Sequence, residues 1–389
     1  MLKWFRNNIK GDYILWFVVA LLALWGILAI YSSTCSLAYK QQHGNTEYYL
    51  IKHGGILAMG LFVMWLTHLI DFQYFTRPAK YLIYLAIGLL LYTLIFGTGL
   101  NSARRWLMIP VVHLTFQPSD FAKVALVMYI AQFLSKRQGK GHIDNFRKTF
   151  LPVLIVIVVV CGLIGIADLS TAAVLFSTSL LLLFIGRIPA KYLLALFGSG
   201  VIVLSIVVIT LMNTDINVGR VSTWKARIEN YVNFMKGDET AESYQNQQAN
   251  IAIANGGILG KGPGKSEQRN FLPLAFSDFI YAIIIEEYGL LGGLFVMGLY
   301  LTLLWRAVRI VIHSPKAFGA LLAIGLSFTL VIQAFMNMGV AVHLLPNTGL
   351  PLPFISMGGT SLLFTSLAMG IILSVSRYTQ QEITEDEEA

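Results

Sequence analysis

Residues 13–31 read YILWFVVALLALWGILAIY and contain no charged side chain. An α-helix rises about 1.5 Å per residue, so a helix over these nineteen residues is long enough to cross roughly 30 Å of hydrocarbon. The run exceeds the apolar region of a cleaved signal peptide, and no convincing small-x-small cleavage site follows it. We therefore interpret residues 13–31 as the first membrane span.

The same apolar character continues along almost the whole chain. Of the 389 residues, 56% are Ala, Val, Ile, Leu, Met, Phe, Trp, Tyr or Cys, and 12% are Asp, Glu, Lys or Arg. That charged share is about half of what a soluble domain carries. The composition excludes a disordered chain, a coiled coil and a cytosolic enzyme with a single anchor. Two cysteines, Cys35 and Cys161, are too few for a disulfide framework.

Nine further apolar stretches follow the first, and each is read as a span. They cover residues 50–70, 79–99, 117–135, 150–167, 169–186, 191–212, 279–305, 317–341 and 355–376. The run 151–186 is too long for one helix and contains one charged residue, Asp168, so we expect the chain to turn there. The sequence thus predicts an all-α, polytopic membrane protein with ten transmembrane helices, forming a single integral membrane domain over residues 1–389.

The Lys and Arg residues indicate the orientation of these spans. With the N-terminus inside, the inner segments hold sixteen of them, and the short outer loops hold four: Lys40, Lys52, Arg104 and Arg105. Positive residues accumulate on the cytoplasmic side of membrane proteins, so both termini are predicted to be cytoplasmic. Residues 378–389 then form an acidic cytoplasmic tail, read as a solvated end or, alternatively, a docking segment for a partner.

One long hydrophilic segment, residues 213–278, separates the seventh and eighth predicted helices and is expected outside. Its Gly-rich stretch GGILGKGPGK (256–265) leads to three cations at a spacing of four: Lys261, Lys265 and Arg269. Exposed backbone N–H groups and cations of this kind suit a phosphate. A nucleotide loop is improbable because Leu259 stands where a glycine is required. A lipid headgroup or lipid-linked phosphate fits better, and Arg104 and Arg105 add a second outer cluster, or an ordinary interface anchor.

Ionisable groups within spans are costly and suggest function. Asp120 and Lys123 stand three apart, so they share a helix face and can pair, either for function or to neutralise one another. Asp168 precedes Leu169 and could equally be a helix N-cap. Asp278 stands where the outer loop enters the bilayer, and there we favour a functional role. The seven histidines are scattered, and no metal site is predicted from the sequence.

Several long motifs occur in one order along the chain. They are NSARRWLMIP (101–110), FQPSDFAK (116–123), ADLSTAAV (167–174), LPLAFSDFIYA (272–282) and ISMGGTS (355–361). Together they closely resemble the SEDS family of shape, elongation, division and sporulation proteins, which includes FtsW and RodA. The resemblance runs from about Ile14 to Arg377. Within the family, the sequence is most similar to FtsW proteins of the Bacteroidetes type, although TGLPLPF is more like RodA.

The resemblance implies a peptidoglycan glycosyltransferase of the bacterial cytoplasmic membrane. Such proteins polymerise lipid II, a disaccharide-pentapeptide on undecaprenyl pyrophosphate, during cell division. Their partners are a class B penicillin-binding protein, which crosslinks the strand, and other divisome proteins. The family's essential aspartate, in LPxAxxDFIFA, corresponds to Asp278. The acid–lysine pair of QPSE-x-x-K corresponds to Asp120 and Lys123, with aspartate in place of glutamate, and the PDLGT aspartate corresponds to Asp168.

The chemistry of this reaction assigns roles to the candidate residues. The acceptor hydroxyl needs a base, for which we take Asp278, and the leaving pyrophosphate needs charge neutralisation rather than a proton. The candidates for substrate binding are Arg104, Arg105, Lys261, Lys265, Arg269, Asp120, Lys123 and Asp168. No cofactor is required, but a divalent cation could share the neutralisation. The alternatives are a RodA-type elongation polymerase, a lipid II flippase and a non-catalytic scaffold for the penicillin-binding protein.

Overall fold

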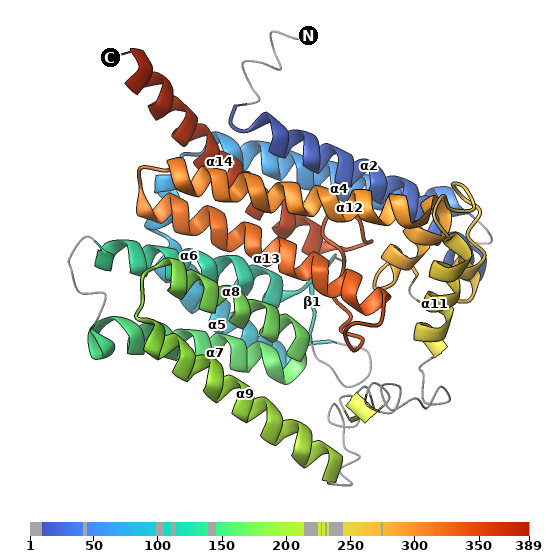
Figure 1. Ribbon diagram of the computed structural model, residues 1–389, viewed down its shortest axis with the longest axis horizontal. Helices are drawn as coiled ribbons and strands as arrows, with labels where there is room; N and C mark the ends of the chain where they lie inside the picture. The colour runs from blue at the N-terminus through green and yellow to red at the C-terminus, as the bar shows by residue number, and fades with distance from the viewer. Residues whose placement is uncertain are drawn as a thin grey trace.

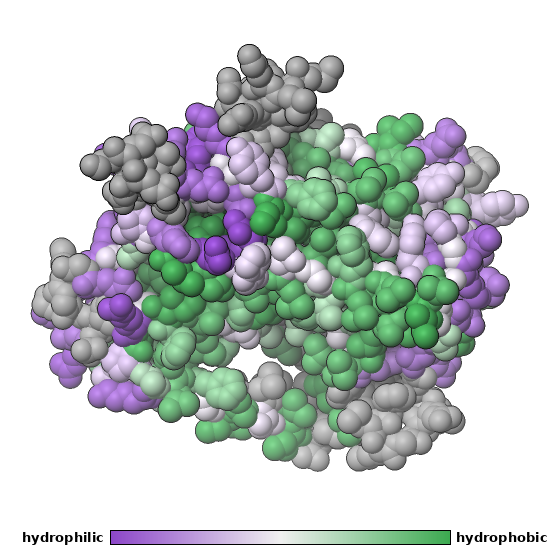
Figure 2. Space-filling view, turned by 45° about the horizontal axis from the view of Figure 1, so that its top comes forward, coloured by the Kyte–Doolittle hydropathy of each residue, from purple (hydrophilic) through white to green (hydrophobic). Residues whose placement is uncertain are grey.

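The fold was analysed in a computed structural model. It describes residues 10–41, 45–98, 105–109, 114–138, 145–213, 244–273 and 275–388, together with residues 225–226, 228–229 and 232. Figure 1 shows a bundle of long helices that lie roughly along one direction. The space-filling view in Figure 2 shows a broad apolar surface bordered by hydrophilic residues on two sides. This is the surface expected of a bundle whose middle faces lipid and whose ends face water.

A helix lies at each of the ten predicted span positions. They are α2 (Tyr13–Ser33), α4 (Thr46–Leu69), α5 (Ala79–Phe96), α6 (Pro118–Gln138), α7 (Leu151–Ala167), α8 (Leu169–Ile185), α9 (Ala190–Asn213), α12 (Ile280–His313), α13 (Ala317–Ala341) and α14 (Thr360–Glu388). Among the described residues, seven helices are long and apolar enough to cross a membrane, and α8 and part of α9 are shorter apolar helices. The all-α, multi-pass fold is confirmed, whereas ten crossings stay a prediction.

The tenth predicted span begins later than expected. Residues 350–359 are not helical, and α14 starts only at Thr360. Pro351 and Pro353 lack the backbone donor that a helix needs, and Gly358 and Gly359 follow them. The predicted acidic tail from residue 378 continues α14 as far as Glu388.

Short elements connect the long helices. They are α3 (Cys35–Gln41), η1 (Phe72–Thr76), β1 (Leu107–Ile109), β2 (Leu114–Phe116), η2 (Phe146–Phe150), α11 (Tyr244–Gly256) and η4 (Gln268–Asn270). Strands β1 and β2 form an antiparallel hairpin in which Met108 faces Thr115. The hairpin precedes α6, and Arg105 lies two residues before β1.

Helix α13 is the centre of the bundle. It packs against α12, α6, α14 and α8, and Figure 1 shows it between these neighbours. Helix α9 lies at the edge of the bundle, where Leu194, Phe197 and Ile202 are exposed. A polar side chain on the inner faces of α13 therefore meets protein on all sides, which makes α13 suited to organising a site.

The described part of the long outer segment is folded onto the bundle. The Gly-rich stretch runs along α12, with Lys261 N donating to Glu286 O at 3.0 Å and Leu290 N donating to Gly257 O at 2.9 Å. Helix α11 contacts the chain beyond α13, where His343 Nδ1 pairs with Asn250 Oδ1 at 2.8 Å. Burial lowers the pKa of the His343 imidazole.

Candidate active site

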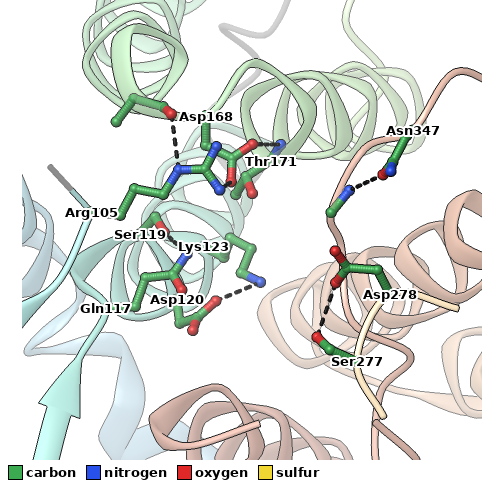
Figure 3. Close-up of polar contacts among 12 residues, drawn as sticks. Arg105, Gln117, Ser119, Asp120, Lys123, Asp168, Thr171, Ser277, Asp278 and Asn347 are labelled. Carbon is green, nitrogen blue, oxygen red and sulfur yellow. Dashed lines mark hydrogen bonds and ion pairs between the residues drawn. The ribbon is translucent and has the colours of Figure 1, made fainter. Parts of the chain in front are cut away.

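A cavity of about 390 Å³ opens among α6, α8, α13, the start of α12 and the segment 348–361. Five of the residues predicted for the site line it: Arg105, Asp120, Lys123, Asp168 and Asp278. They come from positions far apart in the chain, and Figure 3 shows them around one space. The packing of the helices therefore gathers two cations and three carboxylates at a single place.

Asp278 stands on the turn that leads into α12. The Ser277 hydroxyl donates to Asp278 Oδ1 at 2.9 Å, and Asn337 Nδ2 donates to the main-chain oxygen of Asp278 at 2.9 Å. Gly349 passes close to the carboxylate, since a Cβ built there would lie 3.7 Å from Asp278 Oδ2. The aspartate is half-buried, so its carboxylate faces the cavity while its backbone is held by the protein.

Asp120 and Lys123 form an ion pair on one face of α6. Lys123 Nζ lies 2.9 Å from Asp120 Oδ1 and donates to Gln333 Oε1 at 3.0 Å. An ammonium group has three donors, so these contacts leave one for a ligand in the cavity. Asp120 Oδ2 is buried and has no hydrogen-bond partner. The pair thus brings nearly cancelling charge to the cavity wall, with Lys123 as the more available member.

Arg105 and Asp168 form a second ion pair. Arg105 Nη1 lies 3.0 Å from Asp168 Oδ2, and Arg105 Nε donates to Ala167 O at 3.0 Å. Asp168 Oδ1 also accepts from Thr171 N at 3.2 Å, which makes Asp168 the N-cap of α8. Asp168 is therefore both the N-cap of α8 and a member of an ion pair. Because Arg105 precedes β1, this pair ties the hairpin to the mouth of the cavity.

The cations of the Gly-rich stretch lie elsewhere. Lys261, Lys265 and Arg269 are not among the residues that line the cavity. Lys261 Nζ lies 3.2 Å from Glu267 and 3.6 Å from Glu286, and Arg269 Nη1 donates to Ser32 Oγ at 3.0 Å.

Two buried glutamates account for this placement. Glu286 and Glu287 are at most 1% exposed, so their carboxylates need donors from the protein. The Ser266 hydroxyl donates to Glu286, and Lys261 Nζ forms an ion pair with it. The Ser32 hydroxyl donates to Glu287. The spacing along the loop suggested a phosphate site, but it contained no information on which way these side chains point. Arg104 lies outside the described residues.

Two residues of the site were missed by the sequence reasoning. Gln333 lines the cavity, and Asn337 lies one turn further along the same face of α13. The search for polar groups within spans considered only ionisable side chains. Two carboxamides four residues apart in an apolar span are the signal that would have found them.

The described residues contain no group of three or more His, Cys, Asp or Glu side chains that could hold a metal ion. Two carboxylates, those of Asp120 and Asp278, line the same cavity. A divalent cation that shares the neutralisation of a substrate therefore stays a prediction.

Comparison with known proteins identifies close relatives over the whole chain. A family model described as cell cycle protein, for FtsW, RodA and SpoVE, matches residues 12–381. The chain is 35% identical to the probable peptidoglycan glycosyltransferase FtsW of Geobacter metallireducens, covering 96% of this chain and 97% of that protein. It is 31% identical to the stage V sporulation protein E of Bacillus subtilis, covering 95% and 98%.

Solved structures give the same result. A chain from a peptidoglycan synthase complex that coordinates polymerization and crosslinking superposes with a TM-score of 0.75 at 25% identity, covering 95% of this chain and 99% of that one. The rod shape determining protein RodA of Thermus thermophilus superposes with a TM-score of 0.67 at 25% identity, covering 95% and 98%. The family model and these full-length similarities show that the chain belongs to the FtsW, RodA and SpoVE family of cell cycle proteins.

Proposed function

We propose that this protein is a peptidoglycan glycosyltransferase that polymerises lipid II into glycan strands during bacterial cell division. The observation that carries the proposal is the cavity that joins Asp278 to Arg105 and Lys123. Curated relatives named peptidoglycan glycosyltransferase FtsW, at up to 35% identity, support the same activity. A cavity of about 390 Å³ is in the range of small-ligand sites, so it suits the reacting sugars and pyrophosphate, with the peptide and lipid chain outside it.

Asp278 acts as the general base in this proposal. Its carboxylate takes the proton of the acceptor sugar's 4-hydroxyl, and the hydroxyl oxygen attacks the anomeric carbon of the donor. The bond from that carbon to the pyrophosphate breaks, and its electron pair leaves on undecaprenyl pyrophosphate. Arg105 and the remaining donor of Lys123 neutralise the leaving group. Lys261 pairs with the buried Glu286, and Arg269 donates to Ser32 beside the buried Glu287, so we do not assign these two cations to the pyrophosphate.

The cellular setting follows from the same proposal. The protein lies in the bacterial cytoplasmic membrane with both termini inside and the cavity on the outer face. A class B penicillin-binding protein crosslinks the strand that it makes, and other divisome proteins accompany the pair. Similarity to a peptidoglycan synthase complex supports such a partnership. The curated relatives named FtsW favour division over elongation.

The test is polymerisation of labelled lipid II by the full-length protein with its penicillin-binding partner. Asp278→Asn keeps the shape of the side chain but removes the base, and such a loss typically lowers the rate about a hundred- to ten-thousandfold. Asp278→Glu moves the carboxylate by about one bond length, roughly 1.5 Å, and should rescue poorly because a displacement of about 1 Å can cost a hundredfold.

Glu267→Gln is the matched control, because Glu267 is an outer carboxylate that is 70% exposed and lies outside the cavity. It should polymerise at the wild-type rate. Near-normal polymerisation by Asp278→Asn would refute the assignment of the base. No polymer from the wild-type complex would favour the flippase or the scaffold.

A further inference from the structure

Helix α13 carries two carboxamides on one face, four residues apart. Gln333 and Asn337 are 3% and 1% exposed, in a helix whose other buried side chains are mostly apolar. A buried amide must find partners for its two N–H groups within the protein. The hydrogen-bond partners of these two amides are all residues that line the cavity.

Asn337 joins two separate parts of the chain. Its Nδ2 donates to Asp278 O at 2.9 Å and to Leu350 O at 2.8 Å. Both N–H groups of one side chain are thus used, one on the residue that carries the proposed base and one on the segment that leads to α14. Leu350 is itself buried.

The Asp278 carbonyl is the last of three consecutive carbonyls that are held in the same way. Met357 N donates to Phe276 O at 2.9 Å, and the Ser356 hydroxyl donates to Ser277 O at 2.7 Å. The first two donors belong to the segment after Leu350, and only the third belongs to α13. Asn337 therefore fixes the end of this stretch, directly at Asp278.

Gln333 ties the same segment one residue further on. Its Nε2 donates to Pro351 O at 2.8 Å, while its Oε1 accepts from Lys123. Adjacent carbonyls of residues 350 and 351 are thus held by adjacent turns of α13. The segment cannot shift along the helix without breaking both bonds, which gives Asn337 a rigid base.

We propose that Asn337 is a positioning residue for Asp278, acting through the main-chain oxygen and not through substrate. The proposal rests on Asp278 being the base. Asp278 precedes the first turn of α12, whose N-cap residue Phe279 supplies no side-chain hydrogen bond. The bond from Asn337 ties the backbone of Asp278 to another helix. Its loss should lower turnover without weakening the binding of lipid II, because Asn337 does not line the cavity.

The test compares variants of the full-length protein, purified with the penicillin-binding partner and assayed on labelled lipid II. Rates are normalised to monodisperse, folded protein. Asn337→Leu removes both donors, and its kcat should fall about a hundredfold, as for a misplacement of about 1 Å, with KM changed less than about threefold. Asn337→Asp keeps the outline of the side chain, and a protonated acid donates one hydrogen bond instead of two. The kcat of Asn337→Asp should therefore lie between those of the wild type and Asn337→Leu.

Gln132→Leu is the matched control. Gln132 is a buried amide whose Nε2 donates to a backbone carbonyl, that of Thr76, but it lies outside the cavity. It should lower the melting temperature about as much as Asn337→Leu and leave kcat unchanged. Any of three results would overturn the positioning role: an equal loss of kcat in both variants, near-wild-type kcat in Asn337→Leu, or a rise in the KM of Asn337→Leu alone. Failure of the base itself would be seen separately, as activity in Asp278→Asn.

Discussion

Asp120 and Lys123 illustrate how two charges are kept inside this bundle. Their side chains are 5% and 13% exposed, and the ion pair is supported by a single amide, Gln333. Removing one member leaves the other charge buried without a partner, which typically costs about 3–5 kcal/mol. Removing both members leaves no such charge. The two substitutions should therefore not be additive.

We expect Lys123→Met to lower both thermal stability and polymerisation strongly. Asp120→Asn together with Lys123→Met should be less harmful to stability than the sum of the single variants, by roughly 0.5–3 kcal/mol, the range found for residues in contact. Thermal unfolding in detergent measures this cycle. The pair of Lys261 with the exposed Glu267 is the control, and Glu267→Gln should change stability by less than about 1 kcal/mol. Simple additivity would argue against coupling of Asp120 with Lys123.

At the scale of the elements, α12 shows how an outer loop and a span are joined. The helix bends at Gly289, whose φ of 71° and ψ of −175° are not helical. The Gly-rich stretch occupies the bend, and a Cβ at Gly289 would lie 2.1 Å from Ile258 O. A conformation with positive φ and a close backbone neighbour both require glycine here.

Gly289→Ala should therefore detach the Gly-rich stretch from α12 and destabilise the outer part of the protein. The neighbouring backbone would have to move by about 1 Å or more to reach an ordinary contact, and strained positions of this kind cost of order 1–3 kcal/mol. Hydrogen exchange should become faster in residues 256–266. Gly298→Ala, in the same helix and with nothing within 4 Å of the added Cβ, should leave exchange unchanged. Equal exchange in the two variants would contradict this account of the bend.

At the scale of the whole molecule, α12 also connects the two ends of the bundle. Helix α12 is long enough to span a bilayer even beyond its bend, because the 24 residues 290–313 rise about 36 Å, more than the roughly 30 Å of a bilayer core. Its outer end begins beside Asp278, and at its other end Arg306 Nη2 lies 2.5 Å from Asp12 Oδ2, at the start of α2. We therefore expect the cavity and the start of α2 to face opposite sides of the membrane.

We expect cysteine labelling from outside to distinguish these two ends. In a background of Cys35→Ser and Cys161→Ser, Asn270→Cys should react with an impermeant reagent in intact cells. His313→Cys should react only after the membrane is opened. Both positions are exposed in the structure, so accessibility within the fold is matched. The reverse pattern would place the cavity on the cytoplasmic side and remove the polymerase from contact with the cell wall.

The sequence by itself determined those features that depend on near neighbours along the chain. Apolar length alone located the helices, because in lipid a backbone must satisfy its hydrogen bonds within its own segment. The pair of Asp120 and Lys123 was predictable because positions three apart share a helix face. The N-cap of Asp168 was predictable for the same reason, since its partner is Thr171. The late start of α14 at Thr360 was missed, although Gly358 and Gly359 directly precede it.

Only the tertiary structure decided which polar groups share the cavity. Arg105 pairs with Asp168, 63 positions further along the chain, and Arg105 Nε meets the carbonyl of Ala167 at a separation of 62. Asn337 meets the Asp278 carbonyl at a separation of 59. Lys261 and Arg269 turn to Glu286 and Ser32 instead of the cavity. Periodicity shows which face of a helix is polar, but the direction of a side chain between helices depends on how they pack. Buried charges and amides then take the nearest partner that this packing supplies.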